Sequence, residues 1–385
     1  MTDVLPKTVS LPRTTLPREQ PHADPKPAPV APPTGPPPAD KPRDLHSRTI
    51  DDRASVIGAA CGSLGLSWLV YTQVLLLSGF TGFLITWYVV FVLIYAAVTA
   101  VGNPWPVVKD RIASAMLHAG AALVGLCLAL TVIYTALRGA PALPHVDFYT
   151  KDMSGVPGDA PLDQGGILHA LVGSLIEVAI AIVVSLPLGI VTAVYMTEVG
   201  GRLSRIVRTM VEAMTAVPDI LAGLFIYTTL IVAFNFPKSG FAAGLAISVT
   251  MVPIIARAAD VVLRVVPGGL REAGLALGAS QVQVVFRVVL PTALPGLATA
   301  LILAVARGIG ETAPVLLTSG ASTFLNWDPF HYTMNSLPLY IFTAVRSGQP
   351  DYITRGFGAA IVLLVLVLVL FAVTRWLARP RVGRR

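Results

Sequence analysis

The chain has 385 residues, of which 54% are hydrophobic and only 13% are charged, and its mean hydropathy is +0.72. Soluble globular proteins carry about a quarter charged residues, so this composition excludes an ordinary soluble domain and predicts an all-α polytopic membrane protein. The net charge of +7 does not indicate nucleic-acid binding, because the basic residues are spread over the predicted loops between spans.

Residues 1–48 are predicted to form a disordered, polyproline-like cytoplasmic tail. Thirteen prolines fall within the first 46 residues, and little else there could form a core. The N-terminus lacks the apolar core of a signal peptide, so the first apolar run is expected to act as its own insertion signal.

Apolar runs long enough to cross a bilayer, about 20 residues each, follow along the rest of the chain. They predict about eight transmembrane helices, near residues 55–78, 83–101, 113–137, 168–196, 213–236, 239–258, 290–313 and 356–378. Basic residues gather in alternate loops, whereas the loop 138–166 is rich in aspartate. By the positive-inside rule, we expect both termini in the cytoplasm and this loop outside the cell.

The loop 138–166 divides the predicted spans into two groups. Residues 49–138 form three additional N-terminal transmembrane helices, which we expect to be peripheral to any transport. Residues 166–379 form five helices and contain a polar loop, 259–290. Cys61 and Cys127 fall within apolar runs and are expected to be small buried side chains. No cluster of Cys and His residues indicates a metal, and no cofactor is predicted.

Several polar residues interrupt the apolar runs of the second group. The basic amphipathic segment 201–212 is expected to lie on the inner membrane surface. Pro218 and Asp219 open the next span, and a carboxylate in the first turn of a helix is favourable by itself, so we assign no function to Asp219. Glu177 lies deep in a span, where an inter-helix hydrogen bond explains it at least as well as a place in a transport pathway.

The polar loop predicts two short amphipathic helices joined at a glycine. The first begins near Pro267, and Gly278 can take the left-handed conformation that ends it. Ser280 and Gln283 make a capping box for the second helix. One face of each helix carries apolar or small residues: Leu270, Ala273, Gly274 and Leu277 in the first, and Val282, Val285, Phe286 and Val289 in the second. This periodicity alone fits an ordinary amphipathic helix on the membrane surface as well as it fits a helix with a specific function.

A charged pair falls inside the seventh predicted span. Arg307 is about midway along residues 290–313, where an arginine costs roughly 2.5–3.5 kcal/mol on insertion scales. Glu311 follows four residues later, on the same helix face. A charge at this depth must face a partner or a water-filled path, so we predict that Arg307 and Glu311 line a substrate pathway. The alternative is an internal ion pair that only fixes the helix orientation, and the two readings are compatible.

The polar loop resembles the EAA loop of ABC-importer permeases. Glu272-Ala273, Gly278 and Val288-x-Leu290-Pro291 have the spacing of E-A-A, three residues, G, nine residues, I-x-L-P, with Gly274 and Val288 as conservative departures. The resemblance implies that the loop 259–290, here called the coupling loop, docks on a separate ATPase subunit. The coupling residues would be Arg271, Glu272, Ala273, Gly274 and Gly278.

The segment Ala306-Arg307-x-x-Gly310-Glu311-Thr312-Ala313-Pro314 is similar to the A-R-x-x-G-E-T-A-P signature of PstA-type permeases of phosphate importers. The resemblance covers roughly residues 166–378 and implies a five-helix type I ABC permease core in the inner membrane. It also implies an ATPase subunit dimer, a second permease subunit that forms a heterodimer, and an extracytoplasmic phosphate-binding protein received by the outside loops. The chain carries no Gly-x-x-x-x-Gly-Lys-Ser/Thr loop, so it is not expected to be the ATPase or an enzyme.

Phosphate suits an arginine, because a planar guanidinium can hold two of its oxygens at once. We expect Glu311 to compete with phosphate for Arg307 and so to keep the site weak. Three alternatives stay open: a permease for another tetrahedral oxyanion such as sulfate or molybdate, a stand-alone secondary transporter, and a membrane scaffold for phosphate signalling. A secondary transporter often shows two related halves, and the sequence shows no such repeat.

Overall fold

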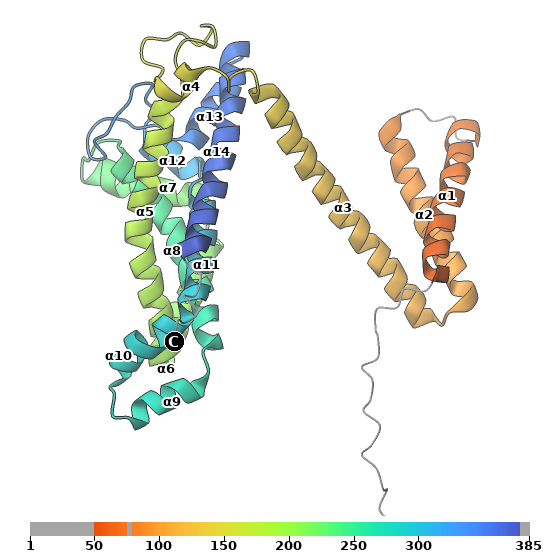
Figure 1. The fold of residues 1–385 in the computed structure, drawn as a ribbon, viewed down its shortest axis with the longest axis horizontal. Helices are drawn as coiled ribbons and strands as arrows, with labels where there is room; N and C mark the ends of the chain where they lie inside the picture. The colour runs from red at the N-terminus through yellow and green to blue at the C-terminus, as the bar shows by residue number, and fades with distance from the viewer. Residues whose placement is uncertain (1–49, 75–78, 378–385) are drawn as a thin grey trace, which may run out of the picture. The chain divides into compact units, whose positions relative to one another are not determined.

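The computed structural model of the chain describes residues 50–74 and 79–377. Over these residues the chain is helical, and the β geometry is one isolated bridge between Gly320 and Met334 (Figure 1). The chain divides into two compact units, Met1–Leu117 and His118–Arg385, and each is described by itself. The predicted tail, residues 1–48, lies outside the described residues.

The first unit contains a helical hairpin. α1 (Ile50–Leu69) ends in a π-helical turn, η1 (Val70–Val74), and packs against α2 (Phe80–Gly102). The indole Nε1 of Trp87 on α2 donates a hydrogen bond to Ser63 Oγ on α1 at 3.0 Å. α3 (Trp105–Gly139) begins in this unit and continues into the second. All three helices are long and apolar enough to cross a membrane, as the sequence predicts.

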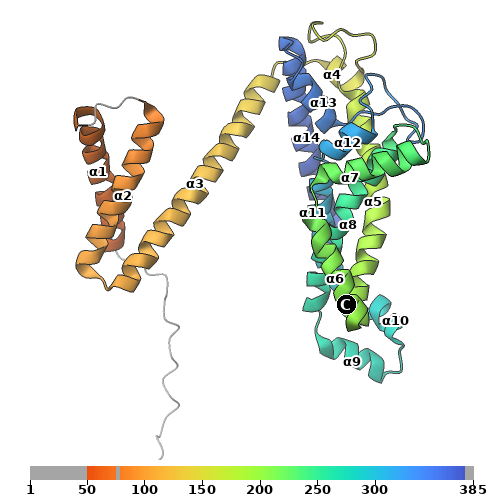
Figure 2. The same ribbon diagram turned by 180° about the vertical axis from the view of Figure 1, so that it is seen from behind.

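The second unit is a bundle of long helices with shorter helices at both ends. α5, α8, α11 and α14 lie side by side in both views (Figures 1 and 2), with α9 and α10 at one end and α4 at the other. The elements after α3 are α4 (Val146–Thr150), α5 (Leu168–Val194), η2 (Tyr195–Val199), α6 (Gly201–Thr215), α7 (Asp219–Ile226), η3 (Tyr227–Ala233), α8 (Gly240–Val265), α9 (Gly268–Ala276), α10 (Gln281–Val284), η4 (Val285–Val289), α11 (Leu290–Gly308), α12 (Ala313–Thr318), α13 (Leu337–Val345) and α14 (Pro350–Leu377).

Small residues allow the helices of this bundle to approach closely. A Cβ added to Gly189 on α5 would lie 2.6 Å from Ile255 Cγ2 on α8, and one added to Gly244 on α8 would lie 2.7 Å from Ile180 Cγ2 on α5. Any larger residue at either position would push the two helices apart. Such packing on small residues is typical of membrane helices, since lipid provides no hydrophobic force between them.

Among the described residues, seven helices are long and apolar enough to span a membrane, or up to eight if one bent pair counts as a single span. The eighth candidate is the predicted span near 213–236, which is bent: α6 meets the segment Asp219–Ala233 at an angle of 102°, with the break at the predicted opening, Pro218-Asp219. Pro218 explains the break: proline lacks an N–H, clashes with the carbonyl four residues earlier and disfavours a helical conformation at Val217. The basic segment 201–212 lies within α6 and packs against α8, where Arg208 pairs with Asp260 at 2.7 Å.

The two cysteines are a second correction. Cys61 and Cys127, expected to be buried, are both exposed on their helices. An apolar run in a membrane helix does not predict burial within the protein, because a helix face turned away from its neighbours is also apolar when it contacts lipid.

In the second unit, the two ends of the bundle differ in the charge of their loops. The aspartate-rich loop before α5 lies at the α4 end, and the arginines of the segments that flank α9 lie at the other. The distribution agrees with the predicted loop charges, while the assignment of one end to the cytoplasm stays a prediction.

Candidate functional site

Arg307 stands at the end of a long continuous helix. α10, η4 and α11 form one helical segment from Gln281 to Gly308, so a single element joins the coupling loop to Arg307. The helix ends earlier than the predicted limit of residue 313, and Arg307 is its second-last residue. Gly308 and Gly310 favour this end because glycine is a poor helix former, and Pro314 lies in the first turn of the next helix, α12, where proline is favourable.

The end of α11 is level with the middle of α8. Gly308 packs so closely on α8 that an added Cβ would lie 2.7 Å from Met251 Sδ. Met251 is halfway along α8, a helix of 26 residues that is by itself long enough to cross the roughly 30 Å hydrocarbon core of a bilayer. Arg307 is therefore level with the middle of α8, at a helix end rather than inside a helix, and its depth in a bilayer stays a prediction.

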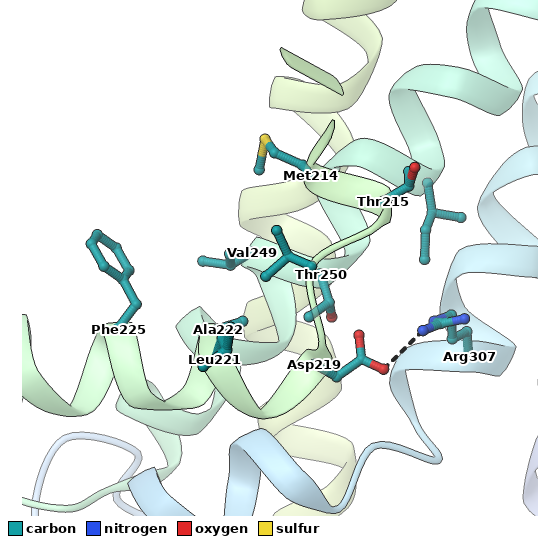
Figure 3. Close-up of a pocket in the computed structure, with 11 residues that line it drawn as sticks. Met214, Thr215, Asp219, Leu221, Ala222, Phe225, Val249, Thr250 and Arg307 are labelled. Carbon is teal, nitrogen blue, oxygen red and sulfur yellow. Dashed lines mark hydrogen bonds and ion pairs between the residues drawn. The ribbon is translucent and has the colours of Figure 1, made fainter. Parts of the chain in front are cut away.

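The carboxylate nearest to Arg307 is Asp219, not Glu311. Arg307 Nη2 donates a hydrogen bond to Asp219 Oδ2 at 2.9 Å, and Figure 3 shows the two side chains pointing toward each other. The predicted pair also forms, with 3.5 Å between Arg307 Nε and Glu311 Oε1, but Glu311 lies beyond the helix end. The reading of Asp219 as a helix-end residue alone is thus incomplete: it starts α7 and is also the ion-pair partner of Arg307.

Asp219 and Arg307 are the charged residues lining a cavity of about 260 Å³ (Figure 3). Thr215 and Thr250 are among the other residues of its wall, and the rest of the wall is apolar. The side chain of Arg307 is 54% exposed, compared with 32% for Asp219 and 12% for Glu311. The guanidinium is therefore accessible from the cavity, which has room for a small anion or several waters. Such a site can bind an oxyanion through charge-assisted hydrogen bonds.

Glu177 does not line this cavity. It is buried, and the Ser319 hydroxyl at the end of α12 donates a hydrogen bond to Glu177 Oε1 at 2.7 Å. Of the two readings of Glu177 that the sequence left open, the structure contains the hydrogen bond between elements.

The local signals of the coupling loop are confirmed. Gly278 has φ of 82°, the left-handed conformation expected after α9. Ser280 and Gln283 form the capping box: Ser280 N donates to Gln283 Oε1 at 2.9 Å, and Gln283 N donates to Ser280 Oγ at 3.4 Å. Each feature depends on residues within a few positions, which is why the sequence alone identifies it.

The second predicted short helix is wrong in its extent and its apolar face. Instead of ending, it continues through η4 into α11. Val285 and Val289 are buried, whereas Val282 and Phe286 are exposed. The π-helical turn η4 causes the difference, because it inserts an extra residue per turn and shifts the register away from a 3.6-residue period.

The guanidinium of Arg271, predicted to contact a separate ATPase subunit, instead contacts other residues of this chain. It binds Glu198 at the end of η2, with 2.9 Å from Arg271 Nη2 to Glu198 Oε1, and its Nη1 donates to the Val266 carbonyl at 2.7 Å. Gln281 Nε2 donates to the Glu198 carbonyl at 2.6 Å, so Glu198 connects both halves of the loop to η2, which follows α5. Glu272 and Ala273 are exposed on α9. Sequence reasoning missed Glu198, because no local pattern relates it to Arg271, 73 positions away.

Comparisons with known proteins agree with the motifs. Residues 185–382 match the family described as binding-protein-dependent transport system inner membrane component. The chain is 39% identical over 247 residues to the phosphate transport system permease protein PstA 1 of Mycobacterium tuberculosis, which covers 64% of this chain and 80% of the relative. It is 33% identical over 256 residues to the PstA permease of Haemophilus influenzae, covering 66% of this chain and 88% of the relative. Among solved structures, it is similar to a chain of a bacterial ABC transporter involved in the import of the acidic polysaccharide alginate, with 14% identity, TM-score 0.49 and coverage of 71% and 99%.

The match to the family model spans the residues of α6 to α14, including the coupling loop and Arg307. Together with the apolar helices, it identifies a multi-pass membrane protein. The chain belongs to the family of binding-protein-dependent transport system inner membrane components, together with the PstA-type permeases.

Proposed function

We propose that this chain is the transmembrane permease subunit of an ABC importer that takes up inorganic phosphate, driven by ATP hydrolysis in a partner subunit. The names of its relatives support phosphate as the substrate. The observation that carries the proposal is the exposed guanidinium of Arg307 in a cavity level with the middle of α8. A charge at such depth in a membrane protein is costly unless it serves a partner or a pathway.

Arg307 is the proposed phosphate contact. A guanidinium can donate two parallel hydrogen bonds to a tetrahedral oxyanion, and the apolar wall strengthens their electrostatic attraction. Asp219 and Glu311 compete for the same donors. Their competition keeps phosphate binding weak enough for release, which a transport site requires.

The exposed surface of α9 is the proposed docking site for the ATPase. Glu272 and Ala273 supply its contact surface. Gly274 lets α9 and α10 approach closely, because an added Cβ would lie 3.0 Å from Val284 Cγ2, and Gly278 shapes the end of the helix. Arg271 serves indirectly: its contacts with Glu198 hold α9 against η2. The α9 end of the bundle then faces the cytoplasm, with both chain termini on that side.

The assembled transporter contains this chain, a second permease subunit, an ATPase dimer and an extracytoplasmic phosphate-binding protein. Residues 166–379 form the permease core, and the helices within residues 49–138 are peripheral to the pathway. The loops 138–166 and 315–354 receive the binding protein, and lipid surrounds the apolar outer faces of the helices.

Replacing Arg307 with Gln tests the proposal. Because Gln cannot provide a positive charge or a two-pronged donor, uptake of radiolabelled phosphate into cells is expected to be lost, while the complex still co-purifies intact. Arg205→Gln, an exposed arginine on α6, is the matched control and is expected to keep uptake. Near-normal uptake by Arg307→Gln would remove Arg307 from the pathway. Competition by excess sulfate or molybdate, if stronger than that by unlabelled phosphate, would reassign the substrate.

A further inference from the structure

Arg307 and its nearest carboxylate belong to different parts of the second unit. Arg307 ends the continuous helix that starts in the coupling loop at Gln281. With a rise of 1.5 Å per residue, that helix is about 40 Å long. Movement of the coupling loop along this axis therefore reaches Arg307 directly.

Asp219 is carried by a second part, formed by α7 and α12. These helices pack backbone to backbone: a Cβ on Gly223 of α7 would lie 2.5 Å from Pro314 Cα of α12. Because there is no side chain between them at this point, the two helices are expected to move together. The non-helical residues 309–312 connect α11 to α12, so they form the joint between the two parts.

The Arg307–Asp219 ion pair spans this joint. While Arg307 Nη2 donates to Asp219, that donor is not available to a bound anion. Asp219 also lines the cavity and places a negative charge beside the arginine, which repels an entering anion. Glu311 adds a second carboxylate at 3.5 Å from Arg307 Nε, so the observed arrangement is unfavourable for phosphate.

We infer that Asp219 is a positioning residue that holds Arg307 in the resting transporter, and that movement of the coupling loop separates the pair and frees the guanidinium for phosphate. This inference rests on the proposed function, because it assigns a resting partner to the proposed phosphate contact. The ion pair favours the resting conformation, and its loss lowers the free energy needed to leave that conformation.

The test uses the complete complex reconstituted in lipid vesicles, with ATP hydrolysis measured without the phosphate-binding protein and phosphate uptake measured with it. Asp219→Asn keeps the size of the side chain and removes its charge. Basal hydrolysis is expected to rise about fivefold, the lower end of the range for coupled sites. The phosphate moved per ATP is expected to fall, because hydrolysis no longer waits for the binding protein.

Three further variants separate positioning from a merely structural role. Glu212→Gln removes the same charge from α6 outside the cavity and is expected to leave basal hydrolysis unchanged. Arg307→Gln breaks the pair from the other side, so it should raise hydrolysis to the same extent, and the double variant Asp219→Asn, Arg307→Gln should go no higher. The exchange Asp219→Arg, Arg307→Asp restores opposite charges and should return basal hydrolysis to near the wild-type rate while uptake stays lost.

Unchanged basal hydrolysis in Asp219→Asn overturns the inference, as does an equal rise in Glu212→Gln or failure of the charge exchange to lower hydrolysis. If Asp219→Asn does not assemble, Arg307→Gln and the charge exchange decide by the same criteria. The proposed function fails differently: normal phosphate uptake by Arg307→Gln or by the charge exchange would show that Arg307 is not the phosphate contact, even with the predicted changes in hydrolysis.

Discussion

Three arginines of this protein each have a partner that is distant in sequence. Arg307, Arg271 and Arg208 each bind a carboxylate that lies more than 50 positions away. In each pair the guanidinium forms charge-assisted hydrogen bonds with the carboxylate. Which carboxylate serves it depends on how the helices pack.

Arg355 is an extreme case, a fully buried arginine near the start of α14. The two N–H groups of its Nη2 are shared among the backbone carbonyls of Ala160, Pro161 and Gln164. One side chain thus fastens the loop before α5 to α14. This loop is the one proposed to receive the binding protein.

Replacing Arg355 with Met is expected to destabilise the protein strongly. Methionine fills similar space but leaves three carbonyls without their donor, so the free energy of unfolding should fall by about 3 kcal/mol or more. Thermal unfolding of the detergent-solubilised protein would show a lower midpoint. Arg346→Met, at an exposed site over the Phe342 ring, is the control and should cost at most about 1 kcal/mol. Equal midpoints for the two variants would contradict the assigned role of Arg355.

At the scale of elements, the joints between helices determine how the core is arranged. Pro218 separates α6 from α7, residues 309–312 separate α11 from α12, and Gly278 follows α9. The π-helical turn η4 lies within the coupling loop, and η2 contacts that loop through Glu198; such turns often occur at functional positions. The proposed function therefore depends on where these helices begin and end.

Gly278→Ala tests the joint after α9. The backbone there has φ of 82°, which an alanine Cβ disfavours by about 1–2 kcal/mol, although the space around it is open. If the ATPase docks on this shape, its retention by the permease during affinity purification should weaken about tenfold.

The matched control for Gly278 is Gly269→Ala. Gly269 lies in α9, also with open space around it and without a positive φ, so alanine should be tolerated there. Retention of the ATPase that is equally reduced in both variants, or in neither, would contradict a role for the left-handed conformation of Gly278.

At the scale of the whole molecule, the family match lies within the second compact unit, residues 118–385. The relatives from Mycobacterium tuberculosis and Haemophilus influenzae match 64–66% of the chain. In the first unit, α1 and α2 form a hairpin of two candidate spans, and α3 continues from this unit into the second. These divisions support the proposal that the additional helices are peripheral to transport.

Deletion of residues 2–104 tests this proposal. It removes the tail and two spans, an even number, so α3 keeps its orientation in the membrane, with Lys109 and Arg111 still at its start. Phosphate uptake per inserted molecule is expected to stay close to that of the full chain. A correctly inserted protein that no longer takes up phosphate would show that these helices are part of the transport machinery.

The sequence by itself determined what depends on composition and short spacing. Hydropathy predicted a helical membrane protein, and the residues around Gly278 and Ser280 predicted a left-handed turn and a capping box. Arg307 was recognised as unusual because the free-energy cost of an arginine within an apolar run can be judged from that run alone. These features involve interactions within one helix turn or the average character of about 20 residues, so they can be deduced without a fold.

Only the tertiary structure decided which distant residues meet. The pairing of Arg307 with Asp219 joins positions 88 apart, and the pairing of Arg271 with Glu198 joins positions 73 apart. The 102° bend between α6 and α7 likewise depends on how α7 packs against α8 and α12. Periodicity indicates which face of a helix is apolar but not which neighbour it contacts or at what depth, because helix packing depends on side chains from several elements at once.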